Sequence, residues 1–97
     1  MRYVILFEDD PAKADVRPKL MPEHQKFLRA HGDRILTAGP LLEESGAGAG
    51  GMWLVEAASA AEARHLVEAD PFWPTGLRKS VRILQWKLVF HAGQALV

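Results

Sequence analysis

The segment RYVILFE, residues 2–8, carries the strongest structural signal of this chain. Its β-branched and aromatic side chains favour an extended strand. Successive side chains of a strand point to opposite faces, and here both sets are apolar. Tyr3, Ile5 and Phe7 lie on one face, and Val4 and Leu6 lie on the other. Because a strand of this kind is normally buried on both sides, we predict a sheet that needs a packing layer on each face.

Two helices are expected from the apolar periodicity and from the residues that begin and end helices. The first runs from Pro22, which suits a first helical turn, to about His31, with Gly32 as its left-handed cap. The second begins at the capping box of residues 59–62. It stops before Asp70, because a residue that precedes proline disfavours the helical conformation.

Three more strands are expected, at residues 34–42, 52–57 and 81–91. Gly39-Pro40 indicates a bulge or the end of regular pairing in the first of them. Residues 9–20 are polar and contain two prolines, which predicts a loop with one helical turn. The glycine-rich residues 43–51 are expected to form a flexible connection.

The resulting order, β-α-β-β-α-β, is that of an α+β, ferredoxin-like domain, and 97 residues suit a single domain over 1–97. We expect a four-stranded antiparallel sheet with two helices on one face. The last strand, like the first, is apolar on both faces. Two helices cover only one face and no residues are left for the other, so the expected partner is a second copy of the chain. The sequence thus predicts a homodimer, or a higher homo-oligomer, with sheets packed face to face.

Composition excludes several classes of function. Twelve basic and twelve acidic residues cancel, so no overall field attracts nucleic acid or an anionic membrane. The absence of cysteine excludes disulfides, thiolate metal sites and a cysteine nucleophile. No apolar run approaches the roughly 18 residues of a membrane span, and the apolar part of the first segment is too short for a signal peptide. We expect a cytoplasmic protein.

Three other patterns are expected to carry no chemistry. Gly46–Gly51 matches a dinucleotide-binding pattern in letters, but it precedes a strand where that motif opens a helix. His24 and His31 are two helical turns apart, about 10.5 Å, which is too far for one metal ion. The basic residues 78–82 are predicted to be a solvated strand edge.

His24 is the most informative single residue. On a helical wheel of MPEHQKFLRAHG, residues 21–32, its ring lies in the middle of the apolar stripe that Phe27 and Leu28 flank. Asp70 is also unusual, because the end of a helix disfavours negative charge. Both helices cover the same sheet face, so the two side chains can meet. A carboxylate that holds one ring nitrogen prepares the other as a general base, but a structural hydrogen bond explains the pair equally well.

Several motifs resemble those of the YCII-related (YciI-like) family, small proteins of the dimeric α+β barrel class. The matching positions are Tyr3–Ile5, Arg17, Pro22-Glu23-His24, Gly32, Thr37–Leu41, Ser59, Glu62-Ala63 and Asp70-Pro71-Phe72. The resemblance covers nearly the whole chain and implies a site at His24 and Asp70, facing a cleft beside the sheet.

The first hypothesis is a small enzyme that needs no cofactor or metal. His24 would act as general base or acid and Asp70 would orient it, while Arg17 would bind an anionic group of a small cyclic or carboxylate ligand. Ala38, Gly39 and Pro40 would contact the substrate, and backbone N–H groups around Ala38 and Gly39 would stabilise a developing oxyanion. Proton abstraction, isomerisation or elimination fits this set. The alternative is a non-catalytic ligand-binding or accessory domain. An open pocket beside His24 favours the enzyme, and a filled core favours the alternative.

Overall fold

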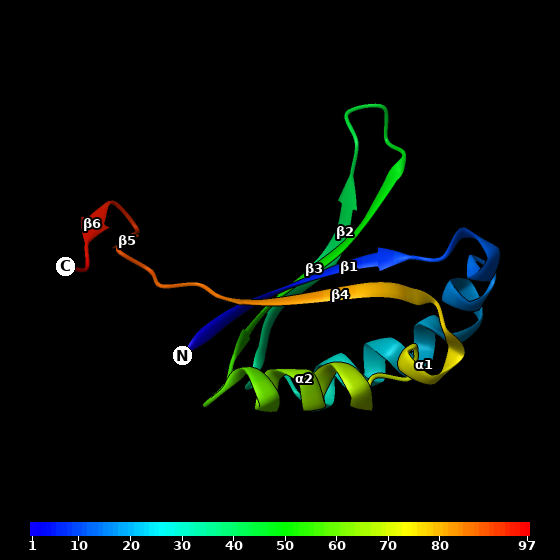
Figure 1. Ribbon diagram of the computed structural model, residues 1–97, viewed down its shortest axis with the longest axis horizontal. Helices are drawn as coiled ribbons and strands as arrows, with labels where there is room; N and C mark the ends of the chain where they lie inside the picture. The colour runs from blue at the N-terminus through cyan, green and yellow to red at the C-terminus, as the bar shows by residue number, and fades with distance from the viewer.

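The computed structural model describes residues 1–97 and contains a four-stranded antiparallel sheet with both long helices on one face (Figure 1). The elements are β1 (Arg2–Asp9), α1 (Val16–Ala30), β2 (Ile35–Leu42), β3 (Gly48–Glu56), α2 (Ala60–Ala69) and β4 (Arg78–Gln85), with short helical turns at Pro11–Lys13 and Trp73–Thr75. The strand order is β2-β3-β1-β4. Each helix therefore connects two strands that flank a third, and the predicted βαββαβ topology is confirmed.

The core lies between the sheet and the helices. Tyr3, Ile5 and Phe7 of β1 are buried on this side, as the alternation of the segment predicts. They pack with Trp53 and Val55 of β3. Helix α2 closes the layer with Ala63, Leu66 and Val67. Each Å² of apolar surface that this layer removes from water favours folding by about 25 cal/mol.

Helix α1 begins six residues before the expected start at Pro22, and this prediction is wrong. Pro18 lies in the first turn, where a missing N–H costs little because no helical acceptor is in reach. Pro22 lies inside the helix and is exposed. The helix ends at His31 with φ −114°, and Gly32 is not left-handed, so the expected glycine cap is also wrong. The predicted helical turn before α1 is confirmed at Pro11–Lys13.

The connection between β2 and β3 is shorter than expected, because Gly48–Gly51 belong to β3. Gly50 has φ +92°, and a Cβ at this position would lie 2.0 Å from the carbonyl oxygen of Phe7. Glycine here permits close approach of two strands, a role that a glycine-rich sequence does not distinguish from flexibility. The expected irregularity near Gly39-Pro40 is confirmed as a register shift between Pro40 and Leu42.

Strand β4 spans residues 78–85 instead of the expected 81–91. Its partner β1 starts at Arg2, and the last backbone bond between them joins the Trp86 N–H to the Arg2 carbonyl at 2.8 Å. The following residues have no strand to pair with. They run away from the sheet and form a small hairpin of β5 (Phe90–His91) and β6 (Gln94–Ala95) (Figure 1).

The sheet face opposite the helices is apolar and carries no helix (Figure 1). A shallow hollow on it is lined by Val4, Leu6, Met52, Leu84, Gln85 and Trp86. Leu84 and Trp86 are 43% and 47% exposed. The predicted two-sided apolar character of the strands is therefore present in the folded chain. No helix of the structure is both long and apolar enough to span a membrane.

Candidate active site

His24 projects from α1 toward the sheet, and its side chain is only 9% exposed. Its ring is stacked on Phe72, with 4.4 Å between the ring centres. The ring of Trp53 is also stacked with the imidazole, at 6.4 Å between ring centres and an angle of 28° between the planes. The Nδ1 atom lies 2.9 Å from Oδ1 of Asp70. An ionised carboxylate can only accept a hydrogen bond, so in a neutral imidazole this contact assigns the hydrogen to Nδ1 and the lone pair to Nε2.

Asp70 follows the last residue of α2 and is almost completely buried. Its Oδ1 also accepts a bond from the Phe72 N–H at 3.2 Å, while Oδ2 accepts one from Nη2 of Arg78 at 2.9 Å. Three donors thus hold this carboxylate, which compensates its burial and its unfavourable place at a helix end.

Arg78 is the residue that the sequence analysis missed, since residues 78–82 were expected to be a solvated edge. Its side chain is 5% exposed. A register shift between Glu8 and Asp9 places Arg78 opposite Asp9, on the helix-covered face. Regular alternation from Val81 would instead put Lys79 on this face. No local signal in the sequence marks this bulge.

The surroundings of Arg78 are mainly aromatic. Its guanidinium lies 3.7 Å from the ring centre of Phe7 and 5.3 Å from that of Trp53. Burial lowers the pKa of Arg78, and the charge of Asp70 opposes this shift. The Nε atom is buried and has no hydrogen-bond partner.

Arg17, the predicted anion-binding residue, also reaches this region from α1. Its Nη2 donates a hydrogen bond to Oδ2 of Asp9, and its guanidinium lies 5.3 Å from the ring centre of Phe72. The side chain is 34% exposed. The charge of Arg17 is therefore already paired by a carboxylate at the edge of the site.

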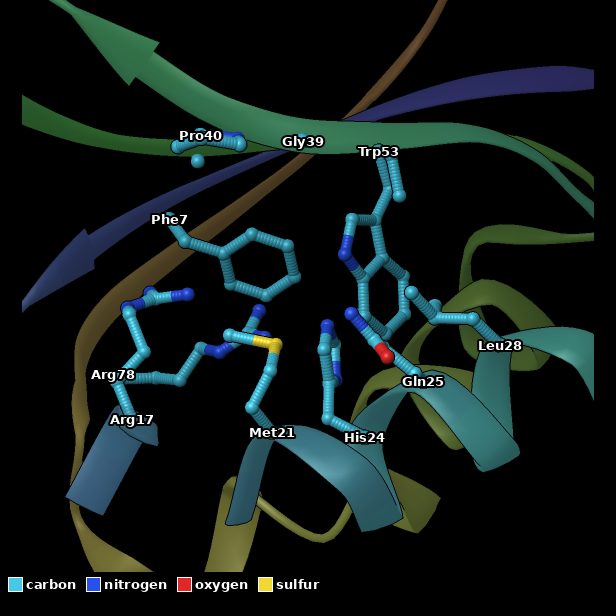
Figure 2. A pocket seen from close by; sticks show the side chains of 12 residues that line it. Phe7, Arg17, Met21, His24, Gln25, Leu28, Gly39, Pro40, Trp53 and Arg78 are labelled. Atoms are coloured by element: carbon cyan, nitrogen blue, oxygen red, sulfur yellow. The ribbon is translucent and has the colours of Figure 1, made fainter. Parts of the chain in front are cut away.

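A cavity of about 210 Å³ lies between α1 and the sheet (Figure 2). Its lining consists of Phe7, Arg17, Met21, His24, Gln25, Leu28, Ala38, Gly39, Pro40, Gly51, Trp53 and Arg78. Phe7 and Trp53 extend from the sheet toward the side chains of α1, and the two arginines lie together at one end (Figure 2). The exposed residues Gln25, Gly39 and Pro40 leave the cavity open on one side.

The cavity brings together five of the six predicted site residues: Arg17, His24, Ala38, Gly39 and Pro40. Asp70 does not line it and contacts His24 from behind. Since an apolar cavity of about 150 Å³ holds a benzene molecule, this one has room for a single substituted ring. The site combines an imidazole held by a carboxylate, aromatic walls and two guanidinium groups. No three side chains of metal-ligating type gather at one point of the structure.

The chain has βαββαβ topology, and its cavity lies between the first helix and the sheet. This fold and its structural match place the protein in the dimeric α+β barrel class. The model of the YCII-related domain matches residues 1–87, and the chain belongs to this family. No protein with a curated description matched the sequence.

A solved structure similar to this chain is 5-chloro-2-hydroxyhydroquinone dehydrochlorinase from Burkholderia phenoliruptrix AC1100, in complex with 2,5-dihydroxybenzoquinone. The TM-score is 0.77 and the sequence identity 28%, over 90% of this chain and 94% of the other. That relative is an enzyme, and its complex contains a small ring compound.

Proposed function

We propose that this protein is a cofactor-free enzyme that transfers a proton on a small cyclic substrate, in an elimination or an isomerisation. One observation carries the proposal: His24 borders a cavity of ring size, and a buried carboxylate holds only one of its two nitrogens. A purely structural histidine requires no such cavity beside it. A general base requires both the cavity and the free nitrogen.

In the proposed reaction, Nε2 of His24 removes a proton from the bound ring. In an elimination, which requires a saturated ring carbon such as that of a keto tautomer, the electron pair of the broken C–H bond forms a new double bond. The leaving group departs with the electron pair of its own bond, and His24 then releases the proton to solvent. In an isomerisation, the same nitrogen returns the proton to a different carbon. Asp70 stabilises the positive charge that His24 carries after it has taken the proton. Asp70 also keeps the imidazole of His24 in one orientation.

The other cavity residues suit a planar substrate. Phe7 and Trp53 offer aromatic faces for a ring. Ala38, Gly39 and Pro40, on the neighbouring strand β2, line the same sheet side of the cavity, and we propose that the backbone N–H groups of Ala38 and Gly39 stabilise an oxyanion as it develops. The dehydrochlorinase relative supports an elimination, because its name describes the loss of hydrogen chloride from a hydroxylated ring.

The decisive experiment compares the wild-type protein with His24→Gln on chlorinated and unchlorinated hydroxyquinols. Chloride release measures elimination, and NMR in D₂O detects exchange of ring hydrogens with solvent. We expect turnover by the wild type and a loss of about 10²–10⁴-fold in the variant, the usual contribution of a general base. His65→Gln is the matched control, because His65 is an exposed histidine on α2. Binding of these rings without turnover or exchange would contradict the proposal and favour a ligand-binding domain.

A further inference from the structure

The guanidinium of Arg78 has fewer acceptors than its burial requires. Of its five N–H donors, one on Nη2 is bonded to Asp70, whereas Nε is buried without a partner and Nη1 makes no hydrogen bond within the protein. A buried donor of a charged group that lacks an acceptor is unfavourable by more than an ordinary hydrogen bond contributes. The guanidinium borders the cavity, so an acceptor that enters the cavity can supply part of the missing hydrogen-bonding.

The charge around Arg78 is also only partly compensated. Its single partner, Asp70, is shared with His24 and with the Phe72 N–H. Arg17 differs, because it has Asp9 as a carboxylate partner and is one-third exposed. Of the two arginines in the cavity wall, Arg78 is thus the one that gains more from an additional anion.

The geometry limits where such an anion can sit relative to the base. Nδ1 of His24 and Nη2 of Arg78 each lie 2.9 Å from an oxygen of the same carboxylate. The imidazole and the guanidinium are therefore close enough for one bound six-membered ring to contact both. Both arginines lie at one end of the cavity, and the apolar Leu28 lies at the other (Figure 2).

We propose that Arg78 determines the substrate class: the cavity binds a ring that carries an ionised oxygen, with this oxygen on the guanidinium of Arg78 and a ring carbon or hydroxyl facing Nε2 of His24. The inference rests on the proposed function and adds the charge and orientation of the substrate to it. Phenolates, enolates of cyclic diketones and hydroxyquinone anions belong to this class. Binding of the oxyanion would also give Arg78 a second anionic acceptor beside Asp70.

Two probes test the inference at neutral pH. 2,5-Dihydroxybenzoquinone is a vinylogous carboxylic acid and is ionised, and its dimethyl ether has the same ring without the charge. Titrations followed by calorimetry should give at least about tenfold tighter binding of the ionised ring to the wild type, because charge-assisted hydrogen bonds to a guanidinium are among the strongest in proteins. A wild type that binds the ionised ring no better than the ether overturns the proposal.

Arg78→Lys is the informative variant, since it keeps a positive charge near Asp70 but lacks the planar, multi-donor guanidinium that binds an oxyanion through several N–H groups. It should lose most of the preference for the ionised ring. Arg29→Lys, at an exposed position of α1, should keep it. A preference retained by Arg78→Lys overturns the inference and leaves the proposed function intact. Conversely, an active His24→Gln variant removes the proposed function without affecting the binding result.

A measurement on the unmodified protein covers the case in which Arg78→Lys does not fold. The Nε–H group of Arg78 gives its own NMR signal in ¹⁵N-labelled protein. The ionised quinone should shift this signal, because an oxyanion on the guanidinium changes the electronic environment of the whole group, and the dimethyl ether should leave it unchanged. An equal response to both rings, or to neither, contradicts an oxyanion on Arg78.

Discussion

His24 and Asp70 lie 46 positions apart in the sequence, yet Nδ1 of the first and Oδ1 of the second are 2.9 Å apart in the interior of the domain. The contact forms because α1 and the end of α2 lie on the same face of the sheet. The other oxygen of Asp70 binds Arg78. One buried carboxylate therefore links the proposed base to the proposed anion-binding residue. A substitution of Asp70 changes the surroundings of both residues at once.

His24→Gln should reduce stability only slightly, by less than about 1.5 kcal/mol, because the amide of glutamine can still donate to Asp70. Urea unfolding curves measure this without any substrate. A loss of several kcal/mol would instead assign the ring a mainly structural role and weaken the case for catalysis.

Asp70→Asn should be much more damaging, by about 3–5 kcal/mol, because it leaves the buried guanidinium of Arg78 without a counter-charge. The double variant Asp70→Asn/Arg78→Gln removes both charges and should be clearly less unstable than the sum of the two single variants. Simple additivity in the same unfolding assay would show that the ion pair contributes little to folding.

Gly50→Ala and Gly48→Ala form a matched pair in β3. A Cβ at Gly50 meets the Phe7 carbonyl and requires a left-handed backbone, while a Cβ at Gly48 has open space around it. Gly50→Ala should cost at least about 2 kcal/mol, and Gly48→Ala should be close to neutral. Thermal unfolding distinguishes the two. Equal stability of both variants would mean that residues 48–51 are a loop after all.

We propose that two copies of the chain pack through the open sheet faces. Light scattering should then give twice the 10.8 kDa mass of one chain. Leu84 lies on this apolar face and is 43% exposed in one isolated chain. Leu84→Lys places a charge there and should yield folded monomers. Lys79→Gln, an exposed change on the same strand, is the control. A monomeric wild type at micromolar concentration would contradict the proposal.

Local patterns in the sequence were sufficient for the topology and for part of the site. The alternation in residues 2–8 indicates two apolar faces because neighbouring side chains of a strand always diverge. The position of His24 in an apolar helical stripe and that of Asp70 at a helix end are equally local signals. They identified a pair that the fold brings into contact.

The remaining features depend on partners that are distant in the sequence. Strand β4 ends at Gln85 because β1 offers no further residues to pair with. Gly50 is needed because the carbonyl of Phe7 approaches it from another strand. Arg78 enters the site because of a register shift opposite Asp9, which turns its side chain from one face of the sheet to the other. The periodicity of a sequence shows which side chains of one helix or strand share a face. Bulges, strand ends and buried charges depend instead on the free energy of contacts between segments.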